Sequence, residues 1–264
     1  MPKEHSPLDR GLPIRAISRS IAVLQAINRG KSLSLQEIAL SASLPYPTAF
    51  RIVQTLMIEG LIECEPYRKL YRATALVQTL SHGFQNHDRM VTLAHPHLLA
   101  LTEEALWPAA ITTRVGTQMM IRDSTHFHTS LTFNNYYPGH TQPILECSSG
   151  HAYLAHAADD ERSTLLKGLR TLETSSETLS MFESGKLVRR IREAGFATME
   201  RNRYTANPGK TSSISAPIFD NGRVLGTITL IFFASAMPMK EAMDRYADIV
   251  KTAAARINEQ ALAK

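Results

Sequence analysis

Cysteine is scarce in this 264-residue sequence, and no apolar run is long enough to cross a membrane. The two cysteines, Cys64 and Cys147, lie far apart, so we expect no disulfide framework, and a reducing cytoplasm suits this composition. The longest apolar candidate, residues 224–236, is too short for a membrane span and rich in strand formers. Residues 1–13 are polar and do not resemble the charged and then apolar leader of a secreted protein. We therefore expect a cytoplasmic protein with no membrane partner.

The spacings that mark catalytic, metal and phosphate-binding sites are also missing. Cys147 and His151 lie four residues apart on a predicted helix, but no recognisable third group is present to orient such a pair for nucleophilic catalysis. No glycine-rich phosphate loop is present. No third metal ligand at a familiar spacing accompanies the two histidine pairs, His95 with His97 and His126 with His128. We expect no catalytic residue, no metal and no cofactor.

What the sequence does contain is a modest excess of positive charge, with a formal net value of +5. Clustered basic residues favour a polyanionic partner such as DNA. The basic residues do cluster in the first third of the chain, at Lys3, Arg10, Arg15, Arg19, Arg29, Lys31, Arg51, Arg68, Lys69 and Arg72.

The same region has the periodicity of three short amphipathic helices followed by a hairpin. A helical stripe over residues 14–28 ends at Gly30, which we expect to adopt the left-handed cap conformation. Ser34 and Glu37 form a predicted capping box for a second helix over residues 35–41. A third helix is expected from about residue 46 to 59, closed by Gly60, with an inward stripe at Ala49, Val53, Leu56 and Met57. Two strand-like runs around a turn at residues 66–69 complete a winged helix-turn-helix.

The third helix is the predicted DNA-reading element, because the second helix of a helix-turn-helix enters the major groove. Arg51 and Gln54 belong to the residue types that make bidentate contacts with guanine and adenine. Arg68, Lys69 and Arg72 in the hairpin are expected to bind phosphates or reach the minor groove. The complete set of predicted DNA-binding residues is Tyr46, Pro47, Thr48, Phe50, Arg51, Gln54, Arg68, Lys69 and Arg72.

Helices and strand hairpins alternate irregularly in the rest of the chain. Residues 74–84 are expected to form a linker helix, and residues 93–105 a long helix. Strands are expected at residues 109–115, 118–122, 129–133, 212–219 and 224–233, and further helices at 150–157, 159–169, 186–194 and 240–262. Without strict strand–helix–strand alternation, this pattern predicts an α+β fold with an antiparallel sheet.

Several stretches resemble the IclR family of transcriptional regulators over nearly the whole chain. In the first part these are residues 15–20 (Arg-Ala-Ile-Ser-Arg-Ser), 33–39, 44–45 leading to 51–56, and 59–62. In the second part they are residues 149–155 and 216–219. Family members commonly open the recognition helix with Lys-Ser or Arg-Thr, whereas this chain has Tyr46-Pro47, so an operator sequence does not carry over.

The resemblance implies a GAF-like effector domain, with a ligand pocket between its sheet and a helix that begins around residues 147–150. A helix N-terminus suits a carboxylate, and aromatic walls suit a ring, so an aromatic carboxylic acid such as a hydroxylated phenylpropanoid or benzoate is the expected effector. Arg114 and Arg203 are candidate counter-ions. The predicted effector-binding residues are Trp107, Met120, Cys147, Ser148, Ser149, Gly150, Tyr204, Ser213, Ser215 and Thr229, with Met119, Phe133 and Ile231 as further walls.

We therefore expect a flexible tail at residues 1–12, a DNA-binding domain at 13–75, and a linker helix with an effector domain at 76–264. The predicted function is that of a DNA-binding regulator of aromatic-compound catabolism and not of an enzyme. Its partners would be an operator, an effector, a second copy in a homodimer or dimer of dimers, and RNA polymerase if it activates. Two alternatives stay open: a DNA-binding protein without effector, and a small-molecule enzyme fused to a DNA-binding module.

Overall fold

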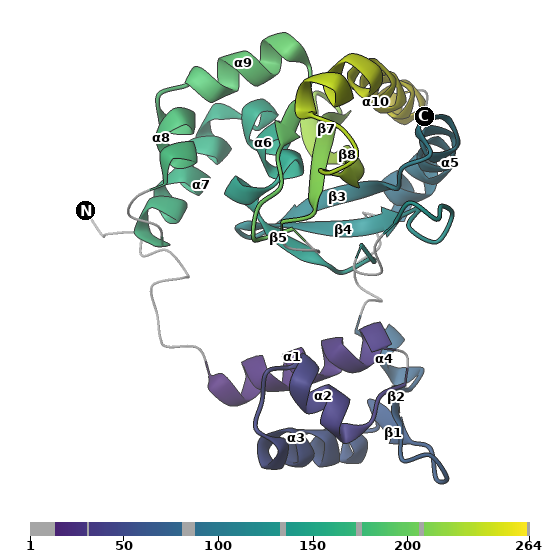
Figure 1. The fold of residues 1–264 in the computed structure, drawn as a ribbon. Coiled ribbons are helices and arrows are strands. Elements are labelled where there is room, and N and C mark those ends of the chain that lie inside the picture. Colours follow the sequence, from purple (N-terminus) through teal and green to yellow (C-terminus); the bar gives the residue numbers. More distant parts are fainter. Residues whose placement is uncertain are drawn as a thin grey trace, which may run out of the picture. The chain divides into compact units, whose positions relative to one another are not determined.

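The computed structural model describes residues 14–30, 32–80, 88–132, 136–172, 176–205 and 209–262. The chain divides into two units, residues 1–86 and 87–264, and each is considered by itself (Figure 1). The tail expected at residues 1–12 lies outside the described residues. The described part contains no helix that is both long and apolar enough to span a bilayer.

The first unit is a three-helix domain followed by a two-stranded hairpin, as the periodicity predicts. Buried aliphatic side chains from all three helices form its core, among them Val23, Ile27, Ile38, Ala49 and Val53. The elements are α1 (Arg15–Gly30), α2 (Leu35–Ser41), α3 (Tyr46–Ile58), β1 (Ile62–Cys64), β2 (Tyr71–Ala73) and α4 (Leu76–Thr79).

Most of the helix caps that the sequence predicts in the first unit are confirmed. The Glu37 amide donates to Ser34 Oγ over 3.3 Å and the Ser34 amide donates to Glu37 Oε2 over 2.8 Å, which is the predicted capping box. Gly60 adopts a φ of 72° just after α3. Two expectations are wrong: Gly30 is the last residue of α1 without a positive φ, and Met57 is 40% exposed because it lies beside the inward stripe.

The second unit is built on a six-stranded antiparallel sheet with strand order β5-β4-β3-β8-β7-β6. The strands are β3 (Ala109–Val115), β4 (Gln118–Ser124), β5 (Thr141–Pro143), β6 (Ala197–Met199), β7 (Thr211–Asp220) and β8 (Arg223–Phe233). The helices are α5 (Asp88–Ala105), α6 (Ser148–His156), α7 (Asp159–Leu172), α8 (Glu177–Glu183), α9 (Lys186–Ala194) and α10 (Met239–Leu262), and the 3-10 turn η2 (Ile144–Glu146) lies before α6.

Strand alternation gives the central sheet two chemically different faces. Ile214, Ala216, Ile228 and Leu230 point to the face that packs against α5 and α10. The residues between them in β7 and β8, among them Ser213, Ser215 and Thr229, point to the opposite face, where α6 packs (Figure 1). One face is therefore an aliphatic core, whereas the other carries a row of hydroxyl groups.

Three parts of the second half differ from the sequence expectation. The strand expected at residues 129–133 is absent over the described residues 129–132, where Thr129 Oγ1 instead donates to the Leu106 carbonyl over 2.7 Å and holds a loop. The linker helix expected at residues 74–84 is the four-residue α4 within the described range. Strands β5 and β6 are only three residues long, and these strands, together with α8, were not predicted because such short segments carry little periodicity.

Candidate functional site

The outer face of α3 presents the predicted DNA-reading side chains. Tyr46, Pro47, Phe50, Arg51 and Gln54 are exposed, and Thr48 is half-buried. The opposite face of the helix is buried in the core of the unit, so packing holds the outer face in a fixed orientation. Within the described residues, the Arg51 guanidinium has neither an ion pair nor a hydrogen bond, which leaves its donors available to a ligand.

A groove between α1 and α3 adds a basic residue that sequence reasoning did not assign to the DNA-reading face. Arg19 and Ser20 of α1 line this groove together with Thr48, Arg51 and Thr55 of α3. The groove has a volume of about 520 Å³. The signal in the sequence was the basic cluster itself, but only packing shows that Arg19 and Arg51 face the same groove.

The hairpin between β1 and β2 carries three residues that were predicted to contact phosphates. Two of them lie at the exposed turn, and the third lies in β2 beside carboxylates. Arg68 and Lys69 are exposed at the turn, where Lys69 adopts a φ of 49°. Arg72 instead donates from Nε to Glu63 Oε1 over 2.6 Å and lies 4.0 Å from Glu65 Oε1. Its charge is therefore shared with two carboxylates of the same hairpin.

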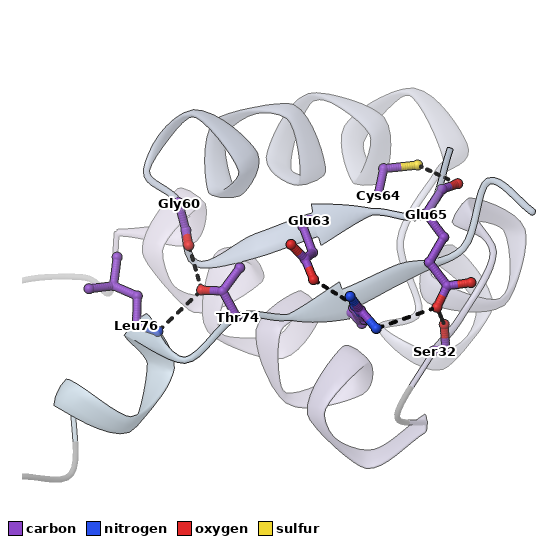
Figure 2. A network of polar contacts seen from close by, with 8 residues as sticks. Ser32, Gly60, Glu63, Cys64, Glu65, Thr74 and Leu76 are labelled. Carbon is purple, nitrogen blue, oxygen red and sulfur yellow. Dashed lines mark hydrogen bonds and ion pairs between the residues drawn. The ribbon is translucent and has the colours of Figure 1, made fainter. Parts of the chain in front are cut away.

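Polar contacts fix the hairpin to the helical core, as Figure 2 shows. Thr74 Oγ1 donates to the Gly60 carbonyl over 2.6 Å and accepts from the Leu76 amide over 3.3 Å. At the other end, Ser32 Oγ donates to Glu65 Oε1 over 3.4 Å. These bonds join the hairpin to the segments that follow α3 and α1, at Gly60 and Ser32.

In the second unit, a small cavity lies between the hydroxyl-bearing face of the sheet and the start of α6. Its apolar end is formed by Ala110, Ile121, Tyr136 and Ile231, which also form a buried cluster. Its polar end is lined by Gln142, Glu146, Cys147, Ser148, Ser149, Thr205, Ser213 and Thr229. The free volume is about 20 Å³, which holds about one water molecule.

A chain of hydroxyl hydrogen bonds joins α6 to the sheet at the polar end. Ser148 Oγ lies 2.7 Å from both Ser213 Oγ and Ser215 Oγ. Ser215 Oγ in turn lies 2.7 Å from Thr229 Oγ1. Each hydroxyl can donate one bond and accept two, so this chain can reorganise around a ligand without leaving a polar group unsatisfied.

The first turn of α6 leaves two backbone amides available at the cavity. The Cys147 side chain caps the helix by accepting from the Gly150 amide over 3.4 Å. Within the described residues, the Ser148 and Ser149 amides have no acceptor. Free amides at a helix N-terminus carry partial positive charge and bind anions, so this end of the cavity suits a carboxylate.

The geometry of Cys147 and His151 differs from that of a nucleophile and its base. Burial raises the pKa of the Cys147 thiol to about 11, so it is protonated at neutral pH. Its sulfur donates to the Pro143 carbonyl over 3.4 Å and accepts from Ser149 Oγ over 3.2 Å. His151 Nε2 instead lies 2.8 Å from the Leu145 carbonyl oxygen, and burial lowers the pKa of this imidazole to about 4.

Half of the ten predicted effector-binding residues line this cavity: Cys147, Ser148, Ser149, Ser213 and Thr229, and the predicted wall residue Ile231 joins them. Ser215 lies behind them in the hydroxyl chain. Gly150 packs against η2, where an added Cβ would lie 1.9 Å from the Ile144 carbonyl oxygen. Phe133 lies outside the described residues.

The remaining predicted residues are placed elsewhere. Trp107 lies in the core on the α5 and α10 face of the sheet, where its Nε1 donates to Tyr246 Oη over 3.2 Å. The Met119 and Met120 side chains and Tyr204 do not line the cavity; Thr205, which follows Tyr204, does.

Neither predicted counter-ion lines the cavity. Arg114 binds Glu161 over 3.2 Å and Tyr153 over 3.3 Å, because β3 places it beside α6 and α7. Arg203 stacks on the Tyr204 ring at 4.8 Å from its centroid. The donors that the described lining residues offer to a carboxylate in this cavity are therefore neutral.

Sequence reasoning missed the other described residues that line the cavity: Ala110, Thr112, Ile121, Tyr136, Gln142, Glu146, Met199 and Thr205. Gln142 lies in β5 and Glu146 is the last residue of η2, both shortly before α6, and their nearness to the predicted helix start was the available signal. Thr205 and Met199 come from segments far from α6 in the sequence, and only the fold brings them there.

Comparison with known families matches both units. Residues 84–259 match the family model of the C-terminal domain of bacterial transcriptional regulator IclR, and residues 16–66 match the IclR helix-turn-helix domain. The HTH-type transcriptional regulator BhcR of Paracoccus denitrificans is 27% identical over 211 residues, which cover 78% of this chain and 73% of BhcR. The regulator KdgR of Escherichia coli is 21% identical over 251 residues, covering 94% of this chain and 92% of KdgR.

Solved structures share the fold. An IclR homologue from Microbacterium hydrocarbonoxydans, complexed with 4-hydroxybenzoate, has a TM-score of 0.68 and 19% identity, covering 94% of this chain and 100% of that one. An IclR family regulator from Brucella abortus has a TM-score of 0.63 and 21% identity, with 98% and 99% of the two chains covered. The curated relatives are transcriptional regulators and not enzymes.

Proposed function

The chain belongs to the IclR family of bacterial transcriptional regulators, and on that premise we propose that it controls genes of aromatic-compound catabolism in response to an aromatic carboxylic acid. It is a transcriptional regulator with a helix-turn-helix domain and an effector-binding domain. Beyond this family-level function, the proposal specifies the class of effector, the class of genes that are controlled, and the residues that contact the DNA and the effector. It places the protein in the cytoplasm, where DNA and effector meet.

For DNA, we propose that α3 enters the major groove of an operator half-site. Arg51 and Gln54 read base edges, Tyr46 and Phe50 press on thymine methyls, and Thr48 contacts a phosphate. The hairpin residues Arg68, Lys69 and Arg72 position the unit on the backbone. The observation behind this assignment is that the exposed face of α3, over a packed core, carries the Arg51 guanidinium, which has no partner among the residues that the structure describes.

For the effector, the chemistry of the cavity carries the proposal. The Ser148 and Ser149 amides, which have no acceptor among the described residues, and the nearby hydroxyls suit a carboxylate, while the cluster around Tyr136 and Ile231 suits an aromatic ring. Three stretches support the same class by their resemblance to the activator of hydroxyphenylpropionate catabolism: residues 107–108 (Trp-Pro), 124–126 (Ser-Thr-His) and 234–237 (Ala-Ser-Ala-Met). The homologue crystallised with 4-hydroxybenzoate shows that a relative with this fold accepts an aromatic acid.

Ligand entry must change the structure around the cavity, because about 20 Å³ has no room for an aromatic ring. We propose that α6 and the facing strands move apart when the effector binds. In a homodimer or dimer of dimers, such a movement would alter the spacing of two recognition helices and therefore the fit to paired half-sites.

The test is capture of fragmented genomic DNA of the source organism by the purified full-length protein, with and without a panel of aromatic acids. We expect enrichment of a few sites beside genes for aromatic degradation, and a change in their occupancy with one acid. Capture of DNA at every position, unchanged by any acid, would instead support a DNA-binding protein without effector. Disappearance of an acid during incubation would support the fused-enzyme alternative.

A further inference from the structure

The second unit contains a groove that is separate from the cavity at the start of α6. It lies between α6, α9, the edge strand β6 and the start of α10 (Figure 1). Its volume is about 310 Å³, which falls within the range of pockets that bind small organic molecules, roughly 300–1,000 Å³. No described residue lines both the groove and the cavity, so the two are different places on the unit.

The walls of the groove are apolar. Five large apolar side chains line it: Leu187, Ile191, Phe196, Met239 and Met243. Phe196, Met239 and Met243 are only partly buried, although each packs against the aliphatic core of the unit. Methionine side chains are flexible and polarizable, so they adapt to apolar groups of different shape. The walls therefore favour a ligand with an apolar body.

The one charged side chain among the described lining residues is basic. Arg190 of α9 lines the groove, and none of the described lining residues is acidic. Within the part of the chain that the structure describes, its guanidinium has neither an ion pair nor a hydrogen bond, although Glu193 lies one turn further along α9. Burial lowers the pKa of His151, which also lines the groove, to about 4, and the positive charge of Arg190 adds to this effect. His151 is therefore neutral at pH 7, and the groove carries the charge of Arg190.

A guanidinium beside apolar walls is complementary to an apolar molecule with one carboxylate. Arginine can bind a carboxylate through two parallel hydrogen bonds. The apolar body of such a ligand would cover the partly exposed Phe196 and methionine side chains, and removing this surface from water favours binding. A sugar or a polyanion would instead place polar groups against apolar walls, which opposes binding.

We infer that this groove is a second small-molecule site of the protein, which binds an apolar monocarboxylate with its carboxylate on Arg190 and its apolar body against Phe196 and Met243. The inference does not depend on the proposed function, because the proposed effector site and this groove share no described lining residue. It goes beyond that function by giving the second unit two ligands in two places.

The experiment is methyl NMR of the full-length protein with isotope-labelled methionine methyl groups. Met239 and Met243 line the groove, whereas Met199 lines the cavity, so these methyl groups report on the two sites separately. The variants Met239→Leu, Met243→Leu and Met199→Leu assign the three signals. Titration with octanoate and with phenylpropionate distinguishes an aliphatic from an aromatic acid, and we expect at least one of them to shift the Met239 and Met243 signals in a saturable way.

The charge requirement is tested with a neutral ligand of the same shape and with variants of α9. Octanamide should bind the wild type about three- to tenfold more weakly than octanoate, the factor of a partly exposed ion pair. Arg190→Gln should weaken octanoate by the same factor and leave octanamide unchanged, whereas Arg190→Lys should keep most of the affinity. Arg189→Gln removes an equal charge from an exposed neighbour that does not line the groove, and should bind octanoate as the wild type does. Thermal melts show whether each variant folds.

Several results would overturn the inference. Equal affinity of the wild type for octanoate and octanamide does so, as does equal weakening of octanoate by Arg190→Gln and Arg189→Gln. Met239 and Met243 signals that move with protein concentration, and with neither acid, would show that the groove is a contact between copies of the chain. A response of Met199 alone to both acids overturns this inference and supports the proposed effector site, whereas a response of Met239 and Met243 alone does the reverse.

Discussion

At the scale of single residues, the contribution of an arginine to DNA binding depends on whether its guanidinium is already paired within the protein. Arg51 and Arg72 have the same side chain on the same unit, but among the described residues only Arg72 has carboxylate partners, Glu63 and Glu65. An arginine already paired within its own domain must lose or share those contacts before it binds a phosphate. The two residues should therefore contribute differently to DNA binding.

Substitution of three basic residues should separate reading from positioning. Arg51→Ala should weaken operator binding by about 1–3 kcal/mol while changing binding to random DNA less, because a base contact is lost. Lys69→Ala should weaken both equally and reduce the salt slope by about one, as a phosphate contact does. Arg72→Ala should have a smaller effect than Lys69→Ala. Fluorescence anisotropy over a range of salt concentrations measures all three, and equal losses on both DNAs would make Arg51 a phosphate contact.

His151 links stability to pH, because burial lowers its pKa from the usual 6.5 to about 4 in the folded protein. Between these values the unfolded chain binds a proton that the folded protein does not. The contribution of His151 is therefore fully present above pH 6.5 and is lost as the pH falls towards 4. From the size of the shift, the loss is about 3 kcal/mol.

Urea unfolding at pH 7 and pH 5 tests this in the wild type and in His151→Gln. Glutamine can still donate to the Leu145 carbonyl but does not titrate, so the variant should lose less stability on acidification. The buried His126 and the half-buried His156 also have lowered pKa values and remain in both proteins, so they cancel in the comparison. Equal losses in the two proteins would show that His151 does not titrate in this range.

At the scale of elements, α6 depends on a close approach to the turn before it. Gly150 lets the helix backbone lie directly against η2, since a Cβ there would meet the Ile144 carbonyl oxygen. That contact places the Ser148 and Ser149 amides at the cavity. The geometry of the proposed effector site therefore rests on one residue without a side chain.

A pair of glycine substitutions tests this requirement. Gly150→Ala should destabilise the second unit by about 1–3 kcal/mol and weaken effector binding, because η2 and α6 must separate. Gly168→Ala in α7 is the matched control, since an added Cβ there meets nothing within 4 Å. It should stabilise the protein by up to about 1 kcal/mol, because alanine favours the helix. Urea unfolding and calorimetry measure both effects; unchanged effector affinity in Gly150→Ala would refute the positional role.

At the scale of the whole molecule, the two units have separate cores, one of which contains the single tryptophan. Trp107 is buried against Phe232 and Phe233 in the second unit, so its fluorescence reports on that unit alone. Far-ultraviolet circular dichroism reports on the helices of both units. The two probes can therefore follow the units independently in one experiment.

We expect thermal unfolding to show two transitions, with Trp107 fluorescence following only one of them. An effector present at a hundred times its Kd should stabilise that transition by about 2.7 kcal/mol and leave the other nearly unchanged. An operator fragment should raise the other transition. Coincident transitions for both probes, moved equally by either ligand, would show that the units unfold together.

The sequence by itself determined the winged helix-turn-helix, the antiparallel α+β second half and the family, because these depend on local periodicity, caps and contiguous motifs. Ser34 with Glu37, and the turn at residues 220–222, act over a few residues and need no tertiary context. The start of α6 as one wall of the cavity was also predicted, through the family resemblance and not through periodicity.

Only the tertiary structure decided which side chains meet at the sites. A period of two shows that neighbours in a strand face opposite ways, but not which face lies towards α6. Trp107 therefore proved to be core, whereas Glu146 and Thr205 proved to line the cavity. Likewise, Arg72 is paired because strand register sets it opposite Glu63. Contacts between residues distant in sequence arise from register and packing, and a single sequence encodes these only through the complete fold.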